Sequence, residues 1–157
     1  MATVTEILVA ASPEEPMRSL PSVRALPGLG LEGDRYALGN GTFSARPRKP
    51  DGELTLIQSE FVEEFARTTG LPFTARDARR NLVTAGVDLN ALVGREFSIG
   101  EVRVQGLRLC EPCSYLAKTT FPEVLPGLVH KGGLRARILS EGVIRVGDAV
   151  VVDQAAR

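Results

Sequence analysis

Two cysteines, Cys110 and Cys113, are the residues with the clearest capacity for chemistry. The apolar stretch Val102 to Leu109 predicts a strand, and Pro112 interrupts the chain directly after it. We therefore expect Cys113 at the mouth of that strand, where a new, helical segment begins. A thiol at the start of a helix is favoured as the thiolate, which attacks electrophiles or binds soft metals. Cys113 is the predicted nucleophile, and Cys110 is either a small buried side chain or a resolving thiol.

The other residues that could bind a metal or carry a proton are few. Two cysteines and the single histidine, His130, cannot complete an ordinary four-ligand zinc site, and they form no disulfide framework typical of small secreted proteins. We expect His130 to be at the surface or hydrogen-bonded. Asp34 and Glu111 are candidate proton carriers.

A glycine-rich segment, residues 28–36, ends in the charged pair Asp34 and Arg35. It is not a dinucleotide fingerprint, because we expect no helix after Gly33, and it is not a P-loop, because no Lys-Ser or Lys-Thr pair closes it. Its glycines allow close approach of the backbone to a ligand, and Arg35 could bind an anionic group. The alternative is a plain turn with a surface ion pair.

Arginines also cluster just before the predicted strand that begins near Asn81. Taken alone, this cluster could be a solvated surface. Combined with further basic residues near glycine turns, it predicts a local anion pocket for a phosphate-bearing ligand. The basic residues in question are Arg35, Arg76, Arg79, Arg80, Lys131, Arg135 and Arg137.

The elements that must position these residues are mainly short strands. Glycines and prolines separate the apolar runs, which favours a β-rich barrel or sandwich with a few helices. The clearest helix spans Ser59 to Thr68, with Ser59 as its capping residue and Gly70 at its end. Turns at Glu141-Gly142 and Gly147-Asp148 predict hairpins in the tail. The predicted strands are Thr5–Ala10, Leu54–Ile57, Asn81–Thr84, Val102–Leu109, Leu134–Leu139 and Ala149–Val152.

Length and charge narrow the function classes. The 157 residues fit a single domain covering residues 1–157, and 19 basic residues balance 19 acidic ones. Balanced charge gives no steering toward nucleic acid or a membrane surface, and we find no targeting or membrane-spanning stretch. We expect a soluble, cytoplasmic protein. The stretch Tyr36 to Gly52 is long and poor in apolar residues, so we expect a functional or mobile loop that covers the pocket.

Five motifs in this order resemble the MOSC domain, the C-terminal domain of molybdenum cofactor sulfurases, in its small stand-alone bacterial form. The resemblance runs over nearly the whole chain and implies a single β-barrel-like domain. The motifs are Gly30-Leu31-Glu32-Gly33-Asp34-Arg35, Arg79-Arg80-Asn81-Leu82-Val83, Gly94 with Phe97 and Ile99-Gly100, Cys110-Glu111-Pro112-Cys113, and Gly142 to Asp148.

The resemblance implies a molybdenum cofactor (molybdopterin) site. In amidoxime-reducing relatives a cysteine ligates molybdenum, and the matching residue here is Cys113, which we assign as catalytic residue and metal ligand. Arg79 and Asn81 match residues that hold the pterin and its phosphate. We add Arg35 and Lys131 as cofactor-binding residues. The implied activity is reduction of N-hydroxylated compounds with electrons from a separate reductase.

Two other functions remain open. Cys113 could carry sulfur as a persulfide from a cysteine desulfurase to a metal–sulfur cofactor, or the chain could be a binding domain whose cysteines merely pack. The sequence contains neither a desulfurase domain nor the extra N-terminal barrel of the amidoxime reducers. Pyridoxal phosphate binding would therefore be a property of the fused sulfurases only, and the oligomeric state stays open.

Overall fold

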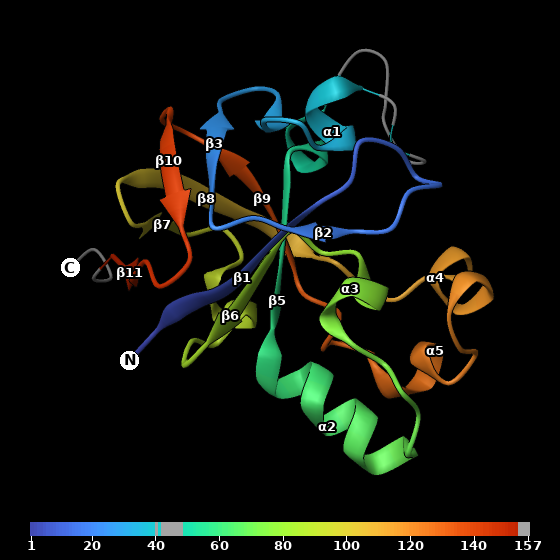
Figure 1. Ribbon diagram of the computed structural model, residues 1–157. Helices are drawn as coiled ribbons and strands as arrows, with labels where there is room; N and C mark the ends of the chain where they lie inside the picture. The colour runs from blue at the N-terminus through green and yellow to red at the C-terminus, as the bar shows by residue number, and fades with distance from the viewer. Residues whose placement is uncertain (40, 42–48, 154–157) are drawn as a thin grey trace.

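A strongly curved eight-stranded sheet forms the frame of the molecule (Figure 1). The computed structural model describes residues 1–39, 41 and 49–153. The strand order is β11-β7-β8-β9-β5-β6-β1-β2, and among the pairings between these described strands only that of β5 with β6 is parallel. The mainly β fold is thus confirmed. The strands are β1 Thr3–Val9, β2 Arg18–Ser19, β5 Leu54–Gln58, β6 Leu82–Ala85, β7 Glu96–Ile99, β8 Val102–Leu109, β9 Leu134–Ile138 and β11 Val150–Val152.

A second, three-stranded sheet has the order β10-β3-β4, with β3 Ser22–Leu26, β4 Gly30–Leu31 and β10 Gly142–Arg145. The predicted hairpins of the tail are wrong. β10 does not fold back on β9 but pairs with β3, and β11 pairs with β7. The turn after Ile138 leads the chain from one sheet to the other, and turn residues specify a change of direction without specifying the partner strand.

Alternation along the strands divides the apolar side chains between two cores. Ile7, Leu56 and Leu82 belong to the core shared with the three-stranded sheet. Their successors Leu8, Ile57 and Val83 point to the opposite face and form the core beneath the helices. Because successive side chains of a strand face opposite sides, β1, β5 and β6 are covered on both faces.

The helices cover the second core. Two of them, α2 and α3, lie in the crossover that connects the parallel strands β5 and β6. Figure 1 shows α2, α3, α4 and α5 on one side of the sheet. Gly70 ends α2 with a φ of 72°, as predicted, but Ser59 is the first helical residue and makes no side-chain cap. The helical elements are α1 Arg35–Leu38, η1 Pro50–Gly52, α2 Ser59–Thr69, α3 Ala75–Ala78, η2 Leu89–Leu92, α4 Ser114–Thr119 and α5 Val124–Gly127.

Two expectations about the loops change. A short helix, α1, does follow Gly33, because the buried Asp34 carboxylate accepts the amide N–H of Tyr36 and caps it. The stretch Tyr36 to Gly52 contains α1 and η1 at its ends. Residues 40 and 42–48, on which the expectation of a loop covering the pocket depends, lie outside the described residues.

Candidate functional site

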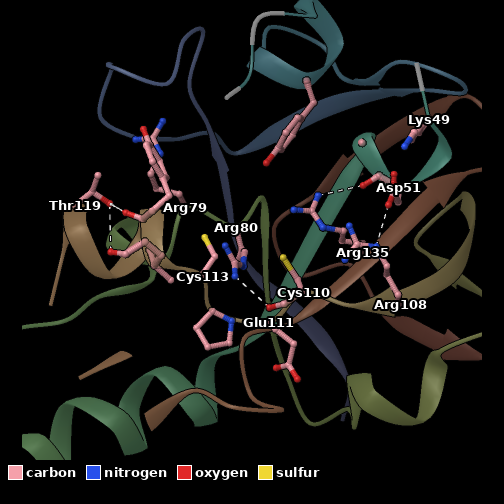
Figure 2. Close-up of a pocket in the computed structure, with 15 residues that line it drawn as sticks. Lys49, Asp51, Arg79, Arg80, Arg108, Cys110, Glu111, Cys113, Thr119 and Arg135 are labelled. Atoms are coloured by element: carbon pink, nitrogen blue, oxygen red, sulfur yellow. Dashed lines mark hydrogen bonds and ion pairs between the residues drawn. The ribbon is translucent and has the colours of Figure 1, made fainter. Parts of the chain in front are cut away.

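A cavity of about 410 Å³ opens where β8 ends and β9 begins, between η1 on one side and α4 on the other (Figure 2). It brings together residues from five separate parts of the chain, including both cysteines. Its described lining is Tyr36, Lys49, Asp51, Gly52, Arg79, Arg80, Arg108, Cys110, Glu111, Pro112, Cys113, Tyr115, Leu116, Thr119 and Arg135.

Cys113 lies in this pocket at the position that the sequence predicts. It is the residue immediately before α4, in an extended conformation with φ −127° and ψ 169°. Its side chain is half-buried and free of any disulfide. Pro112 has no N–H to continue the sheet, so β8 ends and the chain can turn into the helix. A thiol in this position is open to a ligand that enters the pocket.

Cys110 also lines the pocket, but its side chain is only 3% exposed. Its amide N–H donates to the carbonyl of Gly133 at 2.7 Å, which extends the pairing of β8 with β9 by one residue. Cys110 lies close enough to Arg135 to affect the pKa of that guanidinium. The two cysteines therefore differ: Cys113 is accessible, whereas Cys110 is a buried thiol in the cavity wall.

Arg80 holds the cysteine segment in place. Its guanidinium donates to three backbone carbonyls: Gly132 at 2.8 Å, Ala78 at 3.0 Å and Cys110 at 3.1 Å. Each bond to a charged donor is worth about 1.5–3 kcal/mol when the partner would otherwise be buried unpaired. Arg80 thus joins the start of β6 to both sides of the pocket floor.

Gly132 permits the close packing of this floor. A Cβ at this position would overlap the carbonyl oxygen of Cys110 and contact the ring of Pro112. Only glycine lets the turn before β9 approach the cysteine segment so closely.

Arg79 reaches the pocket from an unusual backbone conformation. It ends α3 with a φ of 56°, in the left-handed region that non-glycine residues seldom adopt. Its guanidinium donates to the carbonyls of Glu15 at 2.7 Å and Ser12 at 3.2 Å. Burial, followed by the charge of Arg35, lowers the pKa of Arg79. Arg79 is the one predicted cofactor-binding residue that lines the cavity.

Arg35 lies behind the pocket wall. It is 5% exposed and forms an ion pair with the fully buried Asp34 at 3.1 Å. It also donates to the carbonyl of Arg79 at 3.1 Å. The alternative of a surface pair is therefore wrong, since both residues are buried. Their contacts stabilise the left-handed turn that presents Arg79.

Asn81 is fully buried and bridges three strands. Its Oδ1 accepts the amide N–H and the hydroxyl of Thr55, each at 3.1 Å. Its Nδ2 donates to the carbonyl of Leu8 at 3.2 Å. The structure places this side chain within the sheet and outside the described pocket lining.

Lys131 also lies outside the described lining. Its Nζ contacts the carboxylate of Glu64 at 2.6 Å and lies 5.5 Å from the ring centroid of Phe61. The neighbouring His130 is exposed, as expected, and its Nδ1 lies 2.8 Å from Glu111. This contact fastens the turn before β9 to the cysteine segment.

Sequence reasoning missed the opposite end of the pocket. There, Arg108 donates from Nε to a carboxylate oxygen of Asp51 at 2.9 Å, and Arg135 donates to the Asp51 carbonyl at 3.1 Å. Lys49 and Tyr36 complete this end. Only Arg135 stood among the arginines expected near an anion. The others give no local signal, because they meet only through the pairing of β8 with β9 and the position of η1.

The pocket is cationic although the chain as a whole is neutral. Five cationic side chains and two carboxylates stand among its described lining residues. Burial opposes the charge of Arg135, but Cys110, Tyr36 and Asp51 outweigh it and raise the pKa of the guanidinium. The Nε of Arg135 is buried without a hydrogen-bond partner among the described residues. An unpaired buried donor in a pocket wall indicates a place for a ligand atom or a water.

Comparison with known proteins identifies the family. A family model for the MOSC domain matches residues 34–151. The chain belongs to the MOSC-domain family. A solved structure shares its fold: YuaD from Bacillus subtilis superposes with a TM-score of 0.76 at 15% identity, covering 96% of this chain and 94% of that one.

Two further solved structures give the same result. YiiM from Geobacillus stearothermophilus has a TM-score of 0.74 at 21% identity, covering 98% of this chain and 76% of its own. YiiM from Escherichia coli has a TM-score of 0.71 at 18% identity, and the match covers 98% of this chain and 71% of the YiiM chain. At these identities the similarity establishes the MOSC fold alone. No curated protein matches the chain significantly.

Two further properties of the described residues concern membranes and metals. No helix in the described part of the chain is long and apolar enough to span a membrane. Within the same residues, no group of three or more His, Cys, Asp or Glu side chains is arranged to hold a metal ion.

Proposed function

We propose that this MOSC protein binds a molybdenum cofactor in the Cys113 pocket and reduces N-hydroxylated compounds. The observation that carries the proposal is the combination of an accessible, free thiol with a cationic cavity of about 410 Å³. Thiolate sulfur suits a soft metal, and guanidinium groups suit an anionic, phosphate-bearing ligand. The unpaired Nε of Arg135 in the wall fits a cavity built for a ligand.

In this proposal each residue has a different role in binding the cofactor. Cys113 would ligate the metal, and Arg79 would face the cofactor from the pocket wall. Arg35 and Asn81 act indirectly: Arg35 fixes the turn at Arg79, and Asn81 fixes the strand that follows it. Lys131 would support the rim through Glu64. These three are positioning residues in the proposal.

When bound, the cofactor would supply two-electron redox chemistry. Reduction of an N–OH group consumes two electrons and two protons and releases water, so an electron-donor reductase is the required partner. Glu111, which lines the pocket and pairs with His130, would carry a proton. Asp34 is buried by its contacts with Arg35 and the start of α1, away from the described lining.

The test is metal and pterin analysis of protein purified from cells that make the cofactor. We expect molybdenum and pterin in the wild type, loss of molybdenum from Cys113→Ser, and retention in the matched variant Cys110→Ser. Wild-type protein without molybdenum would overturn the proposal. Equal metal loss in both variants would remove Cys113 from its role as ligand.

A second candidate function is sulfur transfer, favoured by the accessibility of the free Cys113 thiol. In this case the thiolate accepts sulfur from a cysteine desulfurase and holds it as a persulfide. Mass spectrometry after incubation with a desulfurase and cysteine should show one added sulfur on Cys113. Unmodified Cys113 under conditions that load a known acceptor would exclude this function.

A further inference from the structure

The helix that follows Cys113, α4, presents an aromatic side chain to the cavity. Leu116 anchors this helix in the second core and is only 4% exposed. Tyr115, one position earlier, is 36% exposed and lines the cavity together with Thr119. Residues four positions apart lie on the same face of a helix, so Tyr115 and Thr119 form one face of α4 at the cavity.

This face of α4 offers a ring rather than a hydrogen-bond donor from its threonine. The hydroxyl of Thr119 donates to the carbonyls of Tyr115 at 3.0 Å and Leu116 at 3.3 Å. A hydroxyl has a single O–H donor, and in Thr119 the helix itself receives it. The Tyr115 ring is therefore the group through which α4 can bind a ligand.

Arg79 contributes a second flat group to the same end of the cavity. Its two terminal nitrogens donate to the carbonyls of Glu15 at 2.7 Å and Ser12 at 3.2 Å. The N–H groups of a guanidinium lie in its plane, so these bonds use its edge and leave its faces for stacking. Arg79 therefore suits a planar ligand group better than its charge alone indicates.

Tyr115 and Arg79 lie close together beside the reactive thiol. Burial is the largest influence on the pKa of Arg79 and lowers it, and the Tyr115 phenol acts in the opposite direction from nearby. Figure 2 shows Arg79 and Thr119 on one side of Cys113 and Arg80 on the other. An aromatic ring and a guanidinium plane thus line the cavity together at its Cys113 end.

We propose that Tyr115 and Arg79 form a stacking subsite for a planar aromatic ring beside Cys113. Aromatic rings and guanidinium planes both stack on flat π-systems, whereas a puckered aliphatic ring of the same size gains only from burial. The proposal names the class of ligand group at this end of the cavity. It rests on the proposed function only for the source of the ring, which is either the pterin or an aromatic N-hydroxylated substrate.

Alkylation of Cys113 by a matched pair of maleimides tests the subsite. N-phenylmaleimide carries a planar ring, and N-cyclohexylmaleimide carries a puckered ring of similar size. Rate constants at Cys113 are measured on cofactor-free, full-length protein by peptide mass spectrometry and divided by the rate constants for glutathione. We expect the protein to favour the phenyl reagent about two- to tenfold, because stacked aromatic pairs gain free energy beyond the burial of area.

Substitutions at Tyr115 separate the ring from its other properties. Tyr115→Phe should keep the preference for the phenyl reagent, and Tyr115→Leu, which is apolar but not planar, should abolish it. The matched control is Leu125→Ala on α5, which changes a side chain that is 41% exposed and outside the described lining, and it should behave like the wild type. A wild type without preference, or an unchanged preference in Tyr115→Leu, would overturn the proposal.

A second variant keeps the test decisive if Tyr115→Leu does not fold, as judged by circular dichroism. Arg79→Lys retains the positive charge but removes the plane, so the preference for the phenyl reagent should fall in this variant. An unchanged preference would remove Arg79 from the subsite and overturn the proposal as stated.

Pterin analysis of Tyr115→Leu from cells that make the cofactor distinguishes the two sources of the ring. Less bound pterin than in the wild type assigns the subsite to the pterin. Unchanged pterin assigns it to the substrate. Both results keep the subsite, and a protein that never binds molybdenum can still pass or fail the alkylation test.

Discussion

Replacing Asn81 with leucine should destabilise the protein severely, because this side chain joins three strands. Leucine fills a similar volume but leaves the amide N–H of Thr55 and the carbonyl of Leu8 without their side-chain partner. Each buried unpaired group costs about 1–3 kcal/mol, which gives a total of about 2–6 kcal/mol. A domain of this kind has about 5–15 kcal/mol in all. We therefore expect a melting temperature lower by about 5–20 °C.

Urea unfolding followed by circular dichroism measures this loss. The matched control is Asn90→Leu, which removes one exposed hydrogen bond, from Nδ2 to the carbonyl of His130 at 2.7 Å. It should cost about 1 kcal/mol or less. Equal losses in the two variants would refute the reasoning. Normal stability of Asn81→Leu combined with loss of bound cofactor would instead make Asn81 a direct ligand contact.

Three further predictions concern the residues around the pocket and the second core. Burial raises the pKa of Glu53, although Oε1 accepts the amide N–H groups of Ile138 and Gly28. The folded state therefore binds a proton more tightly than the unfolded one, and this group's contribution to stability falls as pH rises from its unfolded pKa to its raised folded pKa. Glu53→Gln can keep both hydrogen bonds but carries no charge. The urea midpoint of the variant, relative to that of the wild type, should therefore rise between pH 4 and pH 7. A difference between the two midpoints that does not depend on pH would contradict this. Gly132→Ala should lower the free energy of unfolding by about 1–3 kcal/mol, because the new Cβ overlaps the Cys110 carbonyl, and it should speed alkylation of Cys110. The control Gly52→Ala, which has open space at its Cβ, should change neither the stability nor the alkylation rate. Lys131→Met should leave the free energy of unfolding almost unchanged, because its ion pair with Glu64 is exposed and screened by solvent. A marked loss in urea unfolding would show that the pair is not an ordinary surface contact.

Local patterns in the sequence predicted the elements well where one signal dominated. Val102 to Leu109 forms β8 with the expected bounds, and Ser59 to Thr68 matches α2 to within one residue. The partners of the strands were less predictable. β10 pairs with β3, more than a hundred residues earlier, and alternation along a strand does not encode which edge it joins.

The same limit applies to the site. The position of Cys113 before a helix follows from the proline and the end of β8, and both are local. The pairing of Arg108 with Asp51 joins residues 57 positions apart and requires the finished sheet. Arg35 and Asn81 have the same side-chain types as ligand-binding residues, but their polar atoms are engaged by Asp34 and Thr55. The sequence identifies the hydrogen-bond donors, but the packing of the folded chain decides whether each donor bonds to a neighbouring residue or to a ligand.

The three bonds of Arg80 also govern when the site can exist during synthesis of the chain. One guanidinium links segments separated by 30 and 52 positions, so the pocket floor cannot close on a nascent chain before the turn at Gly132 has been made. Any ligand that needs the finished cavity must therefore arrive after residue 132 has been synthesised. At about 5–20 residues per second, translation alone separates Arg80 from that moment by several seconds. A chain released before β9 would present Cys113 as an unprotected thiol, open to oxidation and without a cavity to guide its reactivity.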